Sequence, residues 1–421
     1  MKDPSQKMTR SFVWMNAAQF GGALNDNVFR MLVVFFLIGM KGADQASEVA
    51  AVVGAIFVVP FLLFMTTAGW LADRFSKRHI TVVVKIMEIT AMTLALGAFY
   101  YRNEWIAYGV VFLMSTQSAL FGPTKYGIVP ELVGNNRLSR ANSLIVLFTY
   151  LAIIIGTALA PTVDIVLGGN YVAATYVCLG IGVLGLLAAL RVEVTPAMHG
   201  ERSLSPLILR DVWRTLRSIR HEGYLILSVI ASAFFLLLGG YVQLNLIPFG
   251  MEMLDLSEQE SGYLFLLAAV GIGFGAWAVG RLSGRAIRLG LVPVGMLGVI
   301  LASLGLAFYP GHLIAVCCFI ILLGISAGFF VVPLEAYVQY RSPANRRGEI
   351  LAAKGFLSWS GVLLAAGLLY LFAEVLGLTP AQGFLVMGLF TLLLLLVAFY
   401  FVPTFFRLFL STVTKRESEP E

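Results

Sequence analysis

The sequence contains little charge, because only 12% of its 421 residues are Asp, Glu, Lys or Arg, against about 25% in soluble globular proteins. Its three cysteines, Cys178, Cys317 and Cys318, all lie in apolar runs, a pattern that gives neither a disulfide framework nor a thiolate metal site. The dipeptide Gly-Lys never occurs, so the chain has no Walker A loop for ATP. These absences exclude an ordinary soluble protein, and we expect no catalytic residues, no cofactor and no metal.

Long hydrophobic runs dominate the chain, in which 59% of the residues are hydrophobic. At about 20 residues per spanning helix, this content is sufficient for about twelve helices. The runs are continuous rather than alternating, which disfavours an outer-membrane barrel, and the first run is too long for a signal peptide. We therefore predict an all-α integral membrane protein with spans at residues 12–40, 49–72, 79–101, 104–122, 139–167, 171–190, 223–249, 258–280, 286–309, 312–338, 349–376 and 381–403.

The twelve spans divide into two sets of six. Residues 1–190 form the predicted N-terminal half, 191–222 a linker, and 223–421 the C-terminal half with a short tail. Pro123 and Pro333 end the fourth and tenth spans at a separation of 210 residues, which indicates a duplicated six-helix unit of the kind found in secondary transporters. The linker is either a plain connection or carries an interfacial helix between Leu207 and Arg220, with Ser205 and Pro206 at its start. Pairs of glycines in the eighth and tenth spans predict close helix packing: Gly271 and Gly275, Gly324 and Gly328.

Basic residues lie on one side of this topology. The N-terminal tail, the even-numbered connections, the linker and the C-terminal tail contain nearly all of them, whereas the opposite connections hold only Lys41 and Arg102 among many acidic residues. The positive-inside rule therefore places both termini and the linker in the cytoplasm. The net charge of +6 is thus a topological signal, and we expect no nucleic acid partner.

The first span contains the densest set of polar residues. Asn16, Gln19, Asp26 and Arg30 follow helical spacing and share one face, and Asn27 lies beside Asp26. Charges inside a bilayer are costly and mark functional candidates. Asp26 either binds a cationic substrate group or forms a structural ion pair with Arg30.

The end of the fourth span is the second candidate region. We expect proline and glycine in residues 122–127 to break the helix there, beside a cavity. Lys125 either binds an anion such as phosphate or is an ordinary lysine at the membrane edge. The corresponding position of the second half is Glu335, so the halves present opposite charges. Weaker candidates are Glu88, Lys85 and Lys354. For the two lysines, which lie near cytoplasmic ends, simple extension to the interface is the alternative.

The connection between the second and third spans, residues 69–78, resembles the signature loop of the major facilitator superfamily, with Ser76 where that family usually has glycine. The resemblance implies that the loop aspartate, Asp73, makes contacts that hold one conformational state. We expect the gating residues to be Asp73, Arg74, Arg78, Glu131 and Arg137.

Residues 19–27, 123–132 and 136–142 resemble the bacterial lysophospholipid transporter branch of that superfamily. The resemblance implies an inner-membrane flippase that moves lysophospholipids, notably lysophosphatidylethanolamine, from the outer to the inner leaflet for reacylation. Some relatives are fused to acyltransferase and acyl-activating domains, so such an enzyme would be a separate partner of this chain, which we expect to act as a monomer among membrane lipids. The substrate-binding residues are then expected to be Gln19, Asp26, Asn27, Arg30, Lys125 and Glu335.

A second function stays open. A proton-coupled exporter of amphipathic drugs would use Asp26 or Glu335 to carry the proton. Dependence on a proton gradient would favour this alternative, and gradient-independent flipping would favour the lysophospholipid transporter.

Overall fold

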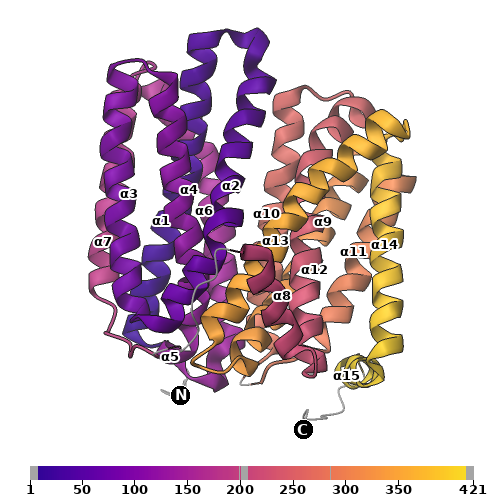
Figure 1. The fold of residues 1–421 in the computed structure, drawn as a ribbon. Coiled ribbons are helices and arrows are strands. Elements are labelled where there is room, and N and C mark those ends of the chain that lie inside the picture. Colours follow the sequence, from indigo (N-terminus) through magenta and orange to yellow (C-terminus); the bar gives the residue numbers. More distant parts are fainter. Residues whose placement is uncertain (1–7, 199, 201–206, 285, 414–421) are drawn as a thin grey trace, which may run out of the picture. The chain divides into compact units, whose positions relative to one another are not determined.

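The computed structural model describes residues 8–198, 200, 207–284 and 286–413. Within these ranges all regular structure is helical, and twelve helices are long and apolar enough to cross a membrane, which confirms the predicted fold class. The longer helices (Figure 1) are α1 (Arg10–Lys41), α2 (Ala46–Arg74), α3 (Lys77–Tyr100), α4 (Glu104–Gly127), α6 (Leu138–Val166), α7 (Tyr171–Leu190), α9 (Gly223–Leu254), α10 (Glu258–Leu282), α11 (Leu291–Phe308), α12 (Leu313–Arg341), α13 (Arg347–Tyr370) and α14 (Pro380–Phe401). The shorter elements are η2 (Ala43–Gln45), α5 (Val129–Val133), η3 (Asn135–Arg137), α8 (Ile208–Ile219), the π-helical η4 (Leu371–Val375) and α15 (Pro403–Val413).

The chain forms two compact units. Unit 1 comprises Met1–Gly134, Ala152–Arg217 and Ser342–Phe356, and unit 2 comprises Asn135–Leu151, Ser218–Arg341 and Leu357–Glu421. Helices α6 and α13 are therefore divided between the units, and the first turns of α13 pack with α2 and α4 of unit 1. The division into six-helix halves at 1–190 and 223–421 stays a prediction.

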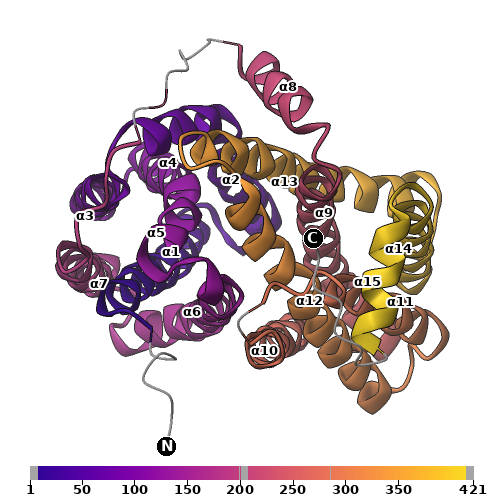
Figure 2. The same ribbon diagram turned by 90° about the horizontal axis from the view of Figure 1, so that it is seen from below.

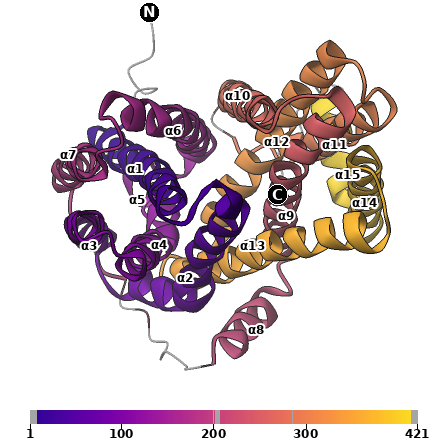
Figure 3. The ribbon, with the colours of Figure 1, turned by 90° about the horizontal axis from the view of Figure 1, so that it is seen from above.

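In unit 1, α1 packs beside α7, α7 beside α3, α3 beside α4 and α4 beside α2, as the view along the helices in Figure 3 shows. Phe29, Phe36 and Phe99 fill the centre with ring-to-ring contacts. Large apolar side chains also face outward, and Leu184 of α7 is 67% exposed. Exposed apolar surface of this kind on spanning helices is suited to contact with lipid tails.

The end of α4 differs from the prediction. We expected Gly122 and Pro123 to break the helix, but α4 continues through Pro123 to Gly127, and α5 begins at Val129. A proline removes only one backbone donor, and helices in membranes tolerate it where neighbouring helices pack closely. Pro123 is buried, and the amide of Ile128 still donates to the carbonyl of Thr124 (3.0 Å). Lys125 consequently lies in the last helical turn of α4.

Unit 2 confirms the predicted close packing of the paired glycines. A side chain at Gly275 of α10 would overlap the backbone of Ile325 of α12, and one at Gly324 of α12 would overlap the backbone of Ala268 of α10. Nearby, Asn142 of α6 and Gln339 of α12 are fully buried and exchange two amide hydrogen bonds of 2.9 and 2.7 Å. Small residues and reciprocal amide bonds are the usual ways to join helices inside a bilayer.

Two amphipathic helices, α8 and α15, come before and after the C-terminal set of spans in the sequence. Helix α8 forms where an interfacial helix was one of the two predicted alternatives, and the predicted start at Ser205 and Pro206 lies outside the described residues. Figure 2 shows α8 beside α13 at the margin of the view. Helix α15 was not predicted, because its eleven residues lie in what the sequence presented as a tail.

Candidate functional site

Asp26 of α1 is bound by α4. Its carboxylate accepts hydrogen bonds from the hydroxyl of Ser118 (2.5 Å) and the amide of Gln117 (3.2 Å), and its side chain is half-buried. Both donors are neutral, so they orient the carboxylate without cancelling its charge. Part of Asp26 is therefore available to a cationic group.

The other predicted residues of α1 form local contacts. Gln19 donates to Asn16 (2.9 Å), and Asn27 donates to the carbonyl of Ala23 (2.8 Å). Arg30 donates to Asn27 (3.3 Å), and its guanidinium lies 5.1 Å from the ring centroid of Phe57. Arg30 and Asp26 thus have separate hydrogen-bond partners, although their opposite charges still attract each other, and the two alternatives for Asp26 stay open.

Behind Asp26, α3 contains a fully buried ion pair, and a hydrogen bond from Asn25 joins it to α1. Lys85 lies 2.6 Å from Glu88, which also accepts a 2.7 Å hydrogen bond from the amide of Asn25, the neighbour of Asp26. The exposed fractions of Lys85 and Glu88 are 1% and 0%, so Lys85 does not extend to the interface, which was the alternative for this residue. Gly22 of α1 leaves the space that the Lys85 ammonium fills, since a side chain at that position would collide with it. The pair can position α1 but cannot touch a substrate.

Lys125 and Lys354 contact the same aromatic ring. The ammonium of Lys125 is 4.8 Å from the ring centroid of Tyr126, and the ammonium of Lys354, in the first turns of α13, is also 4.8 Å from it. Lys354 is 5% exposed, so it too fails to extend to the interface. Lys125 follows Ser118 by seven residues, which places it on the same face of α4 about 10 Å further along the axis. The site in unit 1 therefore has a carboxylate at one position and two ammonium groups two turns away.

Glu335 belongs to unit 2. It lies in α12, two residues after Pro333, and is buried with an exposed fraction of 6%. Pro333 lies inside α12 as Pro123 lies inside α4, in keeping with the proposed internal repeat.

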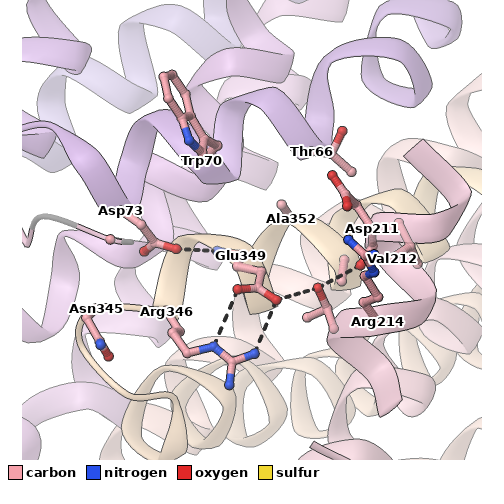
Figure 4. Close-up of a pocket in the computed structure, with 13 residues that line it drawn as sticks. Thr66, Trp70, Asp73, Asp211, Val212, Arg214, Asn345, Arg346, Glu349 and Ala352 are labelled. Atoms are coloured by element: carbon pink, nitrogen blue, oxygen red, sulfur yellow. Dashed lines mark hydrogen bonds and ion pairs between the residues drawn. The ribbon is translucent and has the colours of Figure 1, made fainter. Parts of the chain in front are cut away.

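The last turn of α2 is joined to the N-terminus of α13. Asp73 accepts hydrogen bonds from the backbone amides of Gly348 (2.6 Å) and Glu349 (2.8 Å). Figure 4 shows the bond from Glu349. A helix N-terminus presents unpaired amides and partial positive charge, so a carboxylate fits it well. Gly69 makes the approach feasible, because a side chain there would overlap Ala352 and the carbonyl of Gly348.

The other predicted gating residues have different partners or positions. Arg74 lies over the ring of Trp70 (5.1 Å to the centroid), and Arg78 donates to the carbonyl of Leu190 (3.3 Å). Glu131 pairs with Lys77 at 2.6 Å, and Lys77 is completely buried. Arg137 lies in η3, within unit 2.

Sequence reasoning missed several partners because it searched for charges. Gln117 and Ser118 are adjacent polar residues inside an apolar span, and this pattern is the sequence signal that could identify them as partners of a buried charge. Lys77 was treated only as a basic loop residue, and Glu349 and Thr215 gave no signal at all. Thr215 of α8 donates to the carboxylate of Glu349 (2.7 Å), a contact between segments 134 residues apart.

Comparisons with known proteins show the family of this chain. Residues 19–366 match the major facilitator superfamily. The lysophospholipid transporter LplT of Serratia proteamaculans is 25% identical over 375 residues, which cover 88% of this chain and 90% of that protein. LplT of Salmonella newport is 27% identical over 367 residues, 86% of this chain and 87% of that protein.

A solved structure supports the fold. The human organic anion transporter MFSD10 superposes with a TM-score of 0.75 at 16% identity, covering 94% of this chain and 99% of that one. Among the described residues, no group of three or more His, Cys, Asp or Glu side chains is arranged to hold a metal ion. The chain therefore belongs to the major facilitator superfamily and is a multi-pass membrane transporter.

Proposed function

We propose that this chain transports lysophospholipids, moving them from the outer to the inner leaflet of a bacterial inner membrane by alternating access. The observation that carries the proposal is the arrangement of Asp26 with Lys125 and Lys354 in unit 1. A lysophosphatidylethanolamine headgroup joins an ammonium to a phosphate, and these charges complement a carboxylate and two lysines. The names of the two bacterial relatives support the same substrate class.

Asp26 binds the ammonium in this mechanism. Its hydrogen-bond donors on α4 are neutral, and the buried Lys85–Glu88 pair fixes α1 through Asn25. Lys125 and Lys354 bind the phosphate, while the single acyl chain stays against lipid-facing apolar surface. The delivered lipid is then available to a separate acyltransferase.

Asp73 controls access from the cytoplasmic side. The positive-inside rule places the α2–α3 loop in the cytoplasm, so its contact with the N-terminus of α13 closes that end of the substrate path. Opening replaces two backbone hydrogen bonds with bonds to water. When this contact breaks, the lipid is released to the cytoplasmic side, and when the contact forms again, that side is closed.

One observation favours the proton-coupled alternative. Asp26 is a half-buried carboxylate with two neutral donors, and a proton can neutralise it inside the membrane. In that case transport would depend on a proton gradient and would not require a lipid headgroup.

Purified protein in proteoliposomes tests the proposal with fluorescent lysophosphatidylethanolamine. We expect Asp26→Asn and Lys125→Ala each to reduce movement between leaflets by at least about tenfold, the factor for loss of one charge-assisted hydrogen bond. Glu374→Gln and Arg288→Gln, which remove exposed charges elsewhere, are the matched controls and keep the wild-type rate. Wild-type rates in both site variants would overturn the assignment of the headgroup site.

A further inference from the structure

The outer face of α8 combines apolar and basic side chains. Leu209 and Trp213 are 72% and 66% exposed and lie one turn apart. Arg210 and Arg217, also exposed, lie along the adjacent side of the helix. The opposite face is buried and includes Val212, Thr215 and Ile219. Helix α8 thus packs one face on the protein and leaves a Leu-Trp stripe beside an arginine stripe.

This face fits a lipid surface. The spanning helix α9 begins at Gly223, four residues after α8 ends at Ile219, so the chain itself places α8 at a membrane boundary. Tryptophan and leucine enter the boundary between headgroups and acyl chains, and nearby arginines attract anionic headgroups. A helix of twelve residues has marginal stability in water, and lipid contact with its exposed apolar stripe would stabilise α8.

The inner face of α8 contacts the gate, by which we mean the contact of Asp73 with the N-terminus of α13. The Thr215 hydroxyl donates to Glu349, whose own backbone amide donates to Asp73. Beneath the helix lies a cavity of about 390 Å³ whose lining includes Trp70, Asp73, Thr215 and Glu349 (Figure 4). The hydrogen bond from Thr215 to Glu349 therefore links α8 directly to the first turn of α13.

We propose that α8 senses anionic phospholipid in the leaflet on its side of the membrane. Its outer face docks on anionic headgroups, and its inner face then holds Glu349 and favours the closed contact of Asp73. The proposed docking is inferred from the side chains of α8 alone. Its effect on transport also rests on the proposed function, in which the Asp73 contact is the gate. The leaflet that receives the lipid thereby regulates the transporter.

Docking is measured on the full chain with an environment-sensitive fluorophore on Leu209→Cys, in a background with Cys317 and Cys318 replaced. The protein is placed in vesicles of phosphatidylcholine alone or mixed with phosphatidylglycerol. We expect a blue shift that requires phosphatidylglycerol, weakens with salt, and is lost in Arg210→Gln/Arg217→Gln. The control Arg288→Gln/Arg407→Gln removes the same net charge from exposed positions elsewhere and keeps the shift.

Coupling is measured as maleimide labelling of Leu351→Cys, a buried position of α13 beside Gly127. Phosphatidylglycerol should slow this labelling about fivefold in the wild-type background, and Thr215→Val should abolish the slowing while keeping the Leu209 blue shift. A shift that is equal in both lipids, or absent in both because water or a protein covers the helix, overturns the docking. A shift without slowed labelling overturns the coupling. Failure of lysophospholipid transport would leave the docking result unchanged, so the two proposals fail separately.

Discussion

Two buried carboxylates of unit 1 are held by different kinds of partner. Glu88 binds a lysine and an asparagine side chain from within the packed core of α1 and α3, whereas Asp73 binds two backbone amides at the start of α13. Separating Glu88 from Lys85 would leave two charges without water, but separating Asp73 from α13 exposes groups that water satisfies. The first arrangement suits a permanent support, and the second suits a contact that opens in each transport cycle.

The largest effect is expected when the permanent pair is broken. Lys85→Ala leaves Glu88 charged and buried, which costs about 3–5 kcal/mol and lowers the thermal unfolding temperature in detergent. The double variant Lys85→Met/Glu88→Leu removes both charges and should regain most of that stability. If the single variant unfolds at the wild-type temperature, the pair has no supporting role.

Asp73→Asn is expected to act on conformation rather than on stability. The asparagine side chain has one acceptor oxygen, whereas the two backbone amides each bind one oxygen of the aspartate. Loss of one hydrogen bond costs the closed state about 2 kcal/mol, which lowers its population relative to the open state roughly 30-fold. Maleimide labelling of Leu351→Cys should accelerate accordingly, while the unfolding temperature stays close to that of wild type. Asp44→Asn, in the η2 turn, serves as the control. An unchanged labelling rate would remove Asp73 from the gate.

Gly69→Ala tests the same contact without touching a charge. The added methyl group overlaps Ala352 and the backbone of Gly348, so α13 must move away from α2. Overpacking of about 1–2 kcal/mol predicts labelling of Leu351→Cys roughly tenfold faster than in wild type. Gly97→Ala in α3, where the added atom meets open space, is the matched control.

The smallest effect is expected for Arg346→Gln. Arg346 lies 3.2 Å from Glu349, but its side chain is 41% exposed, so water already screens the pair. Exposed pairs contribute less than about 1 kcal/mol, which predicts a change in labelling of about twofold. A change as large as that of Asp73→Asn would show that side-chain charge, and not the helix N-terminus, holds the gate.

Helix number and the close glycine packing could be predicted because hydropathy and residue size specify them locally. Asp26 was found for the same reason, as a charge in an apolar run. The continuation of α4 through Pro123 could not be predicted, since it depends on how neighbouring helices pack around the proline. The partners of Asp73 could not be predicted either. Gly348 and Glu349 lie 275 and 276 residues away and bind through backbone amides, which every residue except proline has, so the sequence does not mark them.

The proposed function is tested most directly by the movement of labelled lysophosphatidylethanolamine between leaflets of proteoliposomes, with and without an imposed proton gradient. Headgroup binding by Asp26, Lys125 and Lys354 predicts movement without a gradient, at a rate that falls when the labelled lipid lacks the ammonium or the phosphate. Movement only under a proton gradient, or at equal rates for all headgroups, would contradict it.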